Sequence, residues 1–283
     1  MTQSSDQVHK GSAGFIELTA AAKHWAYTPA PHALSGRNIL ITGAGDGIGA
    51  VAAKTFASFG ANVLLLGRTR QKLETVFDWI EAHTSTQAVI VPCDLEQLTP
   101  ESVMTLHDAI ADGYGTLDGI LHNASMLGPR VPLAHYPPQE WLRVMQINVN
   151  APFLLTQGLY DLLDRSADAC VINTTSGVSR QGRAYWGAYA VSKHAAEGFN
   201  EVLADETEHA GRIRVYSVNP GGTRTAMRAA AYPQEDPATL PRAEDHMALY
   251  VFLMEGAKPG KPLPPTGAQI QARGWRPTDP ATD

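Results

Sequence analysis

Four glycines within seven residues, at positions 43, 45, 47 and 49, separate two segments of different character. Residues 39–42 are apolar or β-branched, which predicts a buried strand, and residues 50–59 predict a helix that ends at Gly60. A helix that begins directly after a tight turn presents unpaired N–H groups and the positive end of its dipole to that turn. This arrangement suits a phosphate group, and a tight turn without a ligand is the alternative.

The rest of the chain repeats the alternation of strand and helix. Apolar segments predict further strands at 62–67, 88–92, 119–123, 170–173, 213–218 and 268–271. Thr99 followed by Pro100 predicts the start of one intervening helix, and residues 139–165 and 243–255 predict two others. Such alternation predicts an α/β fold, namely a single doubly wound Rossmann-type domain with a mostly parallel sheet of about seven strands.

The same patterns predict where this domain begins and ends. Residues 1–35 form an N-terminal extension of mixed polarity, in which a short packed helix and a partly disordered tail are both compatible with the sequence. Residues 36–272 form the α/β domain, with segments 125–140 and 224–241 as loops that cover a ligand pocket. Residues 273–283 form a C-terminal tail.

Composition excludes several classes of function. The net charge of −6 and the pI of about 5.9 argue against a nucleic-acid surface. Neither a signal-peptide pattern nor an apolar run of membrane-spanning length occurs, so we expect a cytoplasmic protein without a membrane partner. The two cysteines favour buried free thiols over a disulfide, and the ten histidines show no metal-ligand spacing. We expect a small-molecule ligand and no metal.

The end of the second predicted strand indicates which nucleotide the glycine turn binds. An acidic residue at this point would accept the ribose hydroxyls of NAD, but the sequence has Gly67 followed by Arg68 and, two residues later, Arg70. Guanidinium groups favour the additional phosphate of NADP. Asp46, within the glycine turn, acts against this preference. NADP(H) is therefore the expected cofactor, with NAD(H) as the alternative.

A second constellation lies between residues 170 and 193. Tyr189 and Lys193 are four residues apart in a helical pattern and so share one helix face, while Ser176 follows the apolar strand at 170–173. Free tyrosine has a pKa of about 10, and a neighbouring cation favours the phenolate, so Lys193 would bring Tyr189 toward neutral-pH proton transfer. Ser176 would hold a substrate oxygen against the tyrosine. A solvated helix face is the alternative for the pair taken alone.

Together these features resemble the short-chain dehydrogenase/reductase family over roughly residues 36–272. The matching segments, in chain order, are Thr42-Gly-Ala-Gly-Asp-Gly-Ile-Gly49, Cys93-Asp94-Leu95, Asn123-Ala124-Ser125, Asn148-Val149, Ser176, Tyr189-x-x-x-Lys193 and Asn219-Pro220-Gly221 through Thr225. Ser125 departs from the glycine usual in the family. Residues 146–150, 181–189 and 219–228 are similar to the bacterial YciK-type oxidoreductases within it.

The resemblance implies an oxidoreductase that transfers a hydride between a nicotinamide cofactor and a carbonyl or secondary alcohol. It implies a catalytic set of Asn148, Ser176, Tyr189 and Lys193, with Tyr189 as the acid or base and Asn148 positioning a water. With the glycine turn and Arg68, the expected cofactor contacts are Gly43, Gly45, Asp46, Gly47, Ile48, Gly49, Arg68, Asp94, Leu95, Asn123, Ala124, Ser125, Tyr189, Lys193, Pro220, Gly221, Thr223 and Thr225. It also implies a homodimer or homotetramer.

The residues around Asn148 suggest how a water could be held there. Pro152, four residues later, has no N–H to donate to the Asn148 carbonyl, so that carbonyl would be free to bind the water. The alternative is a kink that only bends the long helix around the sheet.

The sequence says less about the substrate. Five arginines and two aromatic residues fall around the expected pocket, namely Arg130, Arg180, Arg183, Arg224, Arg228, Tyr185 and Trp186. The arginines suit an acidic or polar-headed carbonyl compound. Solvated arginines or a subunit contact are the alternative. An NADP-binding sensor with little turnover is the competing function, and an epimerase or dehydratase is a third. The physiological substrate and the reaction direction do not follow from the sequence.

Overall fold

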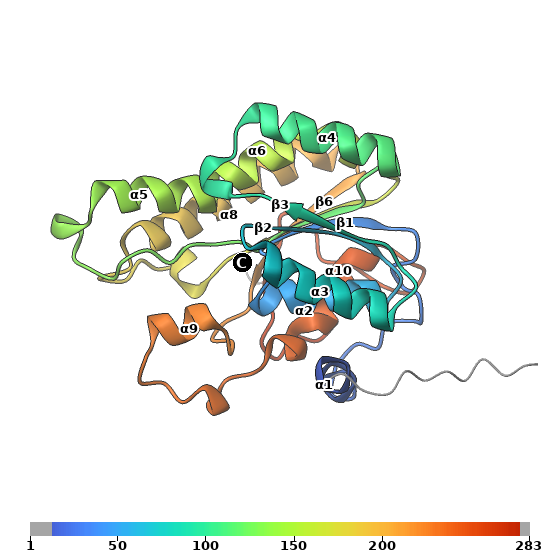
Figure 1. Cartoon of the computed structure of the whole chain (residues 1–283), viewed down its shortest axis with the longest axis horizontal. Coiled ribbons are helices and arrows are strands. Elements are labelled where there is room, and N and C mark those ends of the chain that lie inside the picture. Colours follow the sequence, from blue (N-terminus) through green and yellow to red (C-terminus); the bar gives the residue numbers. More distant parts are fainter. Residues whose placement is uncertain (1–12, 278–283) are drawn as a thin grey trace, which may run out of the picture.

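Seven parallel strands form one sheet in the computed structural model, which describes residues 13–277 (Figure 1). The strands are β1 (Asn38–Thr42), β2 (Asn62–Gly67), β3 (Ala88–Pro92), β4 (Gly119–His122), β5 (Ala169–Thr174), β6 (Ile213–Asn219) and β7 (Gln269–Gln271). Their order is β3-β2-β1-β4-β5-β6-β7, and every neighbouring pair is parallel. The predicted doubly wound fold is confirmed, and the order reverses between β1 and β4.

Helices cover both faces of the sheet, as Figure 1 shows. One face carries α2 (Gly47–Ser58), α3 (Arg70–His83) and α10 (Met247–Glu255). The other carries α4 (Pro100–Tyr114), α6 (Ala151–Gly158) and α8 (Gly187–Glu208). The remaining helices are α1 (Ala13–Ala22), α5 (Pro138–Met145), α7 (Tyr160–Asp164) and α9 (Ala226–Ala231). No helix of the described chain is long and apolar enough to cross a membrane.

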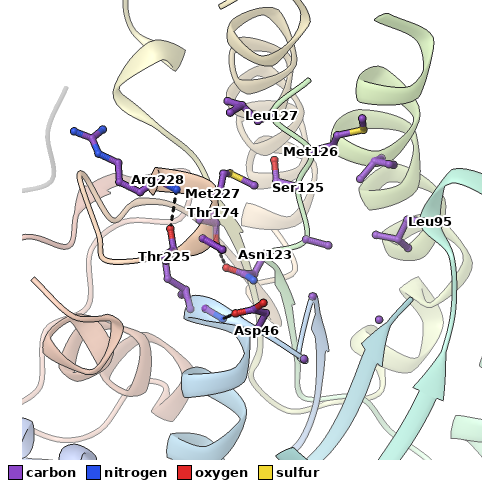
Figure 2. Close-up of a pocket in the computed structure, with 18 of the residues that line it drawn as sticks. Asp46, Leu95, Asn123, Ser125, Met126, Leu127, Thr174, Thr225, Met227 and Arg228 are labelled. Atoms are coloured by element: carbon purple, nitrogen blue, oxygen red, sulfur yellow. Dashed lines mark hydrogen bonds between the residues drawn. The ribbon is translucent and has the colours of Figure 1, made fainter. Parts of the chain in front are cut away.

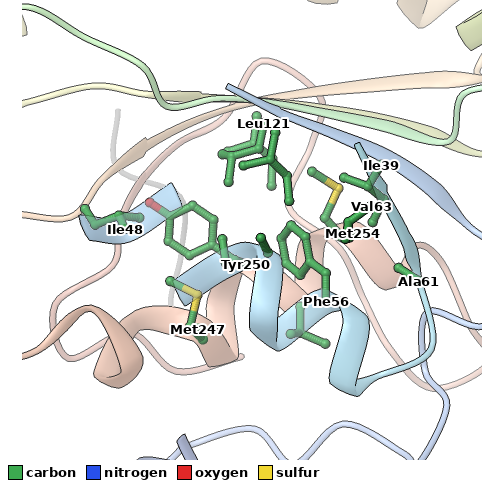
Figure 3. Packing of buried hydrophobic residues seen from close by; sticks show 14 of the residues in the cluster. Ile39, Ile48, Phe56, Ala61, Val63, Leu121, Met247, Tyr250 and Met254 are labelled. Atoms are coloured by element: carbon green, nitrogen blue, oxygen red, sulfur yellow. The ribbon is translucent and has the colours of Figure 1, made fainter. Parts of the chain in front are cut away.

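Each face of the sheet has its own apolar core. Beneath β1 and β4, Phe56 of α2 and Tyr250 of α10 pack against Ile39 and Leu121, and all four are fully buried (Figure 3). The local sequence explains why the helices start where they do. Thr99 caps α4 in a reciprocal pair with Ser102, as its position before Pro100 predicted.

The long helix expected at 139–165 is interrupted. After α5 the chain widens into one π-helical turn, Gln146–Asn150, before it continues as α6 and α7. Pro152 lies at the start of α6, where its missing N–H removes one regular helical bond. The π turn surrounds Asn148, and π turns inside α-helices are frequent at functional sites.

The segment before the sheet packs on the domain. Leu18 is buried, Trp25 donates a hydrogen bond to the Glu244 carbonyl at 3.0 Å, and the Tyr27 ring meets Phe252 edge to face at 5.0 Å. A helix, α1, forms in the region expected to hold one, although the first twelve residues and 278–283 lie outside the described part. Leu34 is fully buried in the core.

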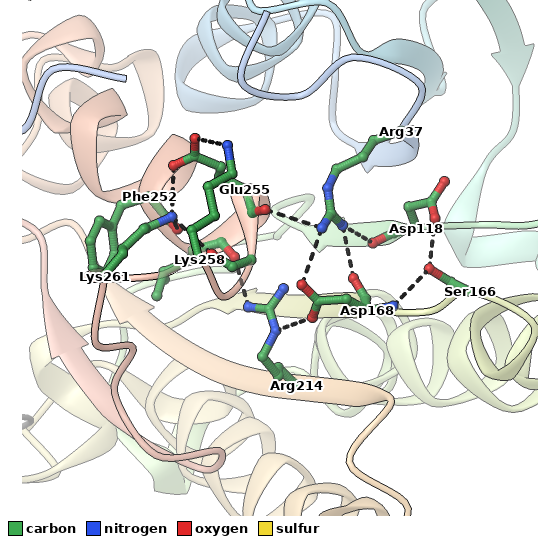
Figure 4. Close-up of polar contacts among 11 residues, drawn as sticks. Arg37, Asp118, Ser166, Asp168, Arg214, Phe252, Glu255, Lys258 and Lys261 are labelled. Atoms are coloured by element: carbon green, nitrogen blue, oxygen red, sulfur yellow. Dashed lines mark hydrogen bonds and ion pairs between the residues drawn. The ribbon is translucent and has the colours of Figure 1, made fainter. Parts of the chain in front are cut away.

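An ion-pair network ties the amino ends of the central strands together (Figure 4). Asp168, just before β5, pairs with Arg214 of β6 at 2.5 Å and with Arg37, just before β1, at 3.2 Å. Arg37 also donates to the carbonyls of Asp168 and Glu255. Both guanidinium groups are largely buried, so they depend on this carboxylate for compensation of their charge.

Asp168→Asn should therefore lower the free energy of unfolding by about 2–3 kcal/mol, because it leaves two buried cations without their carboxylate. Asp164→Asn is the matched control, since Asp164 pairs with Arg212, which is half exposed. Urea denaturation of both variants measures the difference. Equal destabilisation by the two substitutions would contradict a special role for the buried network.

Candidate active site

A cavity of about 610 Å³ opens at the carboxyl ends of the strands, next to the reversal between β1 and β4. Ligands of open α/β sheets bind at this position. Every predicted cofactor residue except Gly49 lines the cavity, and so do Ser176, Tyr189 and Lys193. Figure 2 shows how residues from the glycine turn, from the end of β4 and from α9 converge on it. Residues far apart in the chain are thus brought together.

Gly49 lies behind the cavity and is required by packing. A Cβ atom there would lie 2.3 Å from the Gly43 carbonyl oxygen and 2.7 Å from the Asn123 amide nitrogen, which is closer than any side chain permits. Gly43 has φ of +67°, a left-handed conformation that favours glycine. The turn therefore brings the start of α2 directly against the ends of β1 and β4.

The end of β4 is held by the hydroxyl of Thr42. Its Oγ1 accepts hydrogen bonds from the backbone N–H groups of Asn123 and Ala124, both at 3.0 Å. The Ser125 hydroxyl is buried and has no hydrogen-bond partner among the described residues. The structure thus fixes the Asn-Ala-Ser segment through its backbone. Thr42, the first residue of the glycine motif, had no role assigned from the sequence and is a positioning residue here.

The end of the cavity beside β2 and β3 is lined by charged side chains. Arg68, Asp94 and Lys72 line it, and Lys72 pairs with Asp46 at 2.5 Å. The Asp46 carboxylate also caps α2 by accepting from the Gly47 N–H at 2.7 Å. The hydrogen bond from Lys72 is the main reason that the pKa of Asp46 is lowered. The acidic residue in the glycine turn is therefore compensated by a lysine that sequence analysis missed.

Arg70 does not take part in this end of the cavity. It does not line the cavity, and it forms an exposed ion pair with Glu74, one helical turn later, at 2.8 Å. Sequence proximity to Arg68 was therefore misleading for Arg70, because α3 begins at this residue and directs its side chain along the helix surface.

Tyr189, Lys193 and Ser176 meet at the other end. Tyr189 and Lys193 are buried on one face of α8, and the Lys193 Nζ lies 5.5 Å from the centre of the tyrosine ring. The Ser176 side chain lines the cavity together with Tyr189. Lys193 donates to the carbonyl of Thr174, at the end of β5, at 2.8 Å. The last residue of the strand thus orients the lysine between sheet and helix.

Burial dominates the electrostatics of this group. Desolvation raises the pKa of Tyr189 above its ordinary value, and the side chain of Ser176 acts in the opposite direction. The sequence predicted a lowered pKa from the neighbouring lysine, but here desolvation outweighs other effects. Burial also lowers the pKa of Lys193 to about 8, against the charge of Glu197, so the lysine is close to titration at physiological pH.

Asn148 lies behind the cavity rather than on its surface. Its side chain exchanges two hydrogen bonds with the backbone of Met126, at 2.7 and 2.9 Å, and donates a third to the Ser192 hydroxyl at 3.0 Å. It thereby joins the π-helical turn to the segment after β4 and to α8. Its side-chain groups are committed to these contacts, so any water at Asn148 would need the backbone carbonyl.

Several apolar residues line the cavity beside Tyr189, and the sequence placed one of them, Trp186, near the pocket. Leu127, Trp186, Met227 and Ala231 form an apolar wall beside Tyr189. No pattern in the sequence gives Leu127, Met227 or Ala231 a role, because single apolar residues of a loop or a short helix look like ordinary core residues. Of the arginines considered for substrate recognition, only Arg228 lines the cavity.

Comparison with known proteins agrees with this geometry. A model of the short chain dehydrogenase family matches residues 37–236. The uncharacterized oxidoreductase YciK of Escherichia coli strain K12 is 50% identical over 228 residues, which cover 81% of this chain and 90% of that protein.

Two crystal structures have the same fold over nearly their whole length. A short chain dehydrogenase of Escherichia coli CFT073 complexed with NADPH is 48% identical, with a TM-score of 0.82, 87% of this chain and 100% of that chain covered. One from Shigella flexneri 2a complexed with NADP is 48% identical, with a TM-score of 0.81. The match covers 86% of this chain and 100% of that chain. The sheet, the glycine turn and these matches establish that the chain belongs to the short-chain dehydrogenase family.

Proposed function

We propose that the protein is an NADP(H)-dependent oxidoreductase that interconverts a carbonyl compound and its alcohol. The observation that carries this proposal is that the side chains of Tyr189 and Ser176 line the same cavity, with the buried Lys193 beside the tyrosine ring. Two hydroxyls can hold one substrate oxygen, and one of them can exchange a proton with it. A sensor would have no need for this arrangement.

The residues of the cavity fit a dinucleotide. The glycine turn gives backbone access to a pyrophosphate at the start of α2, and the cavity continues from Arg68 to Tyr189. The related proteins of Escherichia coli and Shigella flexneri were crystallised with NADPH and NADP. When bound, the nicotinamide supplies or accepts the hydride. Asp94 and Leu95 would hold the adenine, and Pro220, Gly221, Thr223 and Thr225 the nicotinamide side.

The chain's own residues then control the proton and the substrate oxygen. Ser176 orients the oxygen, and Tyr189 Oη gives it a proton in reduction or removes one in oxidation. Lys193 grips the nicotinamide ribose and, when charged, favours the phenolate of Tyr189. In this structure burial raises the pKa of Tyr189, and the side chain of Ser176 acts against that rise. Asn148 holds the surrounding segments in place and leaves its carbonyl for a water that leads to Lys193.

Preference for NADP(H) over NAD(H) has its own support. Gly67 occupies the position of the ribose-binding carboxylate, while Arg68 and Lys72 bring two cations to the same end of the cavity. Lys72 also neutralises Asp46, the one residue that acted against a phosphate there. A phosphate on the ribose would meet positive charge rather than a carboxylate.

We also propose a homodimer or homotetramer formed through the long helices. Leu142 of α5, Phe153 of α6 and Val202 of α8 are apolar and at least half exposed, at 60%, 50% and 59%. Apolar side chains on adjacent helices are a typical basis for subunit contacts.

Glu197 supports the charge on Lys193 and connects it to Ser176. It lies one turn after Lys193 on α8 and is buried, and its Oε1 is 2.9 Å from the Ser179 hydroxyl. That hydroxyl in turn lies 2.7 Å from the Ser176 carbonyl. Because Glu197 is the carboxylate whose charge raises the pKa of Lys193 against burial, it is a positioning residue for the catalytic set.

Tyr189→Phe should reduce turnover by about 10²–10⁴-fold, because it removes the proton donor and keeps the ring. NADPH binding, followed by nicotinamide fluorescence, should be retained. A panel of aldehydes, ketones and diketones measures turnover by NADPH oxidation. Substantial residual activity in this variant would require another acid and would contradict the proposed role of Tyr189.

Arg68→Ala and Lys72→Ala should each weaken NADPH binding by roughly tenfold and leave NADH binding nearly unchanged, because each removes a cation from the proposed phosphate site. Arg70→Ala is the matched control, since Arg70 adjoins the site in sequence but does not line the cavity. Fluorescence titration with both nucleotides provides the affinities. Equal losses for NADPH and NADH would argue against phosphate recognition.

Glu197→Gln should lower the pKa of Lys193 below its value of about 8, because the charge that opposes desolvation is removed. Lys193 would then lose its proton, and with it its positive charge, at a lower pH. NMR titration of the labelled lysine side chain measures this directly. Glu201→Gln, one turn further along α8 and exposed, is the control. An unchanged Lys193 titration in the Glu197 variant would refute the coupling.

A further inference from the structure

We infer that the substrate is an uncharged carbonyl compound with an apolar flank, an inference that rests on the proposed function and specifies its substrate class. The alternative raised by the sequence was an acidic substrate received by arginines. An uncharged substrate needs apolar side chains beside Tyr189, and an acidic substrate needs an available cation there. The side chains that form the cavity wall beside Tyr189 therefore decide between the two substrate classes.

The wall beside Tyr189 is apolar. Trp186 and Ala231 are buried in one cluster with Tyr189, and Leu127 and Met227 pack against it. All four also line the cavity. Figure 2 shows the Met227 side chain directed toward Ser125, inside the cavity. A bound molecule that covers this wall gains by removing apolar surface from water, which favours an aliphatic or aromatic group next to the reacting carbonyl.

Arg228 is the one arginine of α9 that lines the cavity, and its charge is already matched. Its Nε and Nη2 donate to the two carboxylate oxygens of Glu235 at 2.6 and 2.7 Å. The guanidinium also lies over the Tyr232 ring at 3.8 Å, and in Figure 2 it points away from Met227. Hydrogen bonding to Glu235 raises the pKa of Arg228 and lowers that of Glu235, so both remain ionised.

Two other arginines of the covering segments have structural partners. Arg130 donates to the Ala231 carbonyl and lies over the Trp186 ring at 4.7 Å. Arg224 donates to the backbone carbonyls of Pro237, Ala238 and Leu240. Neither lines the cavity. These cations hold the segments 125–140 and 224–241 together rather than receive a substrate.

An anionic substrate would therefore be disfavoured at this wall. Its carboxylate would lose water against apolar side chains, and it would have to displace Glu235 from Arg228 to gain a counterion. If the substrate carboxylate took the place of Glu235 on Arg228, the Glu235 carboxylate would lose its counterion instead, so no ion pair would be gained. A neutral substrate incurs neither cost. Of the other cations that line the cavity, Lys193 belongs to the catalytic set, and Arg143 is paired with Glu96 and Glu140.

The test compares two molecules with the same reacting ketone, methyl benzoylformate and benzoylformate. With the full chain and NADPH, we expect kcat/KM for the ester to exceed that for the acid by at least roughly tenfold. Binding of the corresponding alcohols, methyl mandelate and mandelate, to the NADPH-saturated protein by calorimetry gives the same comparison without turnover. A preference for the acids, equal values for the two classes, or binding of neither alcohol would overturn the inference.

A pair of variants tests the cause. Glu235→Gln should raise kcat/KM for benzoylformate relative to the ester by roughly tenfold, because Arg228 loses its carboxylate. The double variant Glu235→Gln with Arg228→Met should return the ratio to that of the unmodified protein. An unchanged ratio in the single variant would show that Arg228 does not balance charge in the pocket, contrary to the inference.

These results are separable from the proposed function. If no carbonyl compound is turned over, the proposed function fails, and the binding of the two alcohols still decides whether the pocket prefers neutral ligands. If carbonyl compounds are reduced in a Tyr189-dependent reaction but the anionic members are preferred, the proposed function stands and the substrate inference fails.

Discussion

The close approach of the glycine turn to the end of β4 is the constraint on which the site depends. Gly49 has no room for a side chain, since the Gly43 carbonyl and the Asn123 amide occupy that space. This contact places the start of α2 at the strand ends, and the Thr42 hydroxyl fixes the backbone of Asn123 and Ala124. The cavity exists because helix, turn and strand meet there without an intervening side chain.

At the other end of the cavity, beside Tyr189, the constraint is the stabilisation of a buried positive charge, that of Lys193. Lys193 is buried, and its ammonium is held by the Thr174 carbonyl and by the charge of Glu197 one turn away. Its lowered pKa shows that these contacts compensate only part of the lost hydration. A lysine in this condition responds strongly to nearby charge, whereas the pKa of the neighbouring Tyr189 is raised mainly by its own burial.

The sequence was informative where local rules act. Strands, the glycine turn, the Thr99 cap and the helix face shared by Tyr189 and Lys193 follow from periodicity and turn chemistry, and the structure has all of them. It was less informative where tertiary contacts decide. The ion pair of Lys72 with Asp46, the commitment of Asn148 to Met126 and the pairing of Arg228 with Glu235 depend on side-chain directions in space. Arg70 shows that nearness in sequence does not place a side chain in the site. It is the first residue of α3, and its side chain pairs with Glu74 outside the cavity.

The two halves of the cavity are built differently, and in the proposed function one would bind the cofactor and the other the substrate. Strand ends form the cofactor half, and their positions are fixed by the hydrogen bonds of the sheet. The substrate half takes Met227 and Ala231 from the six-residue helix α9. That helix begins at its cap Thr225, whose methyl group would lie 3.4 Å from a Cβ at Gly47. The helix that contributes to the substrate wall is thus anchored against the glycine turn, so the position of the wall depends on the geometry of the cofactor half.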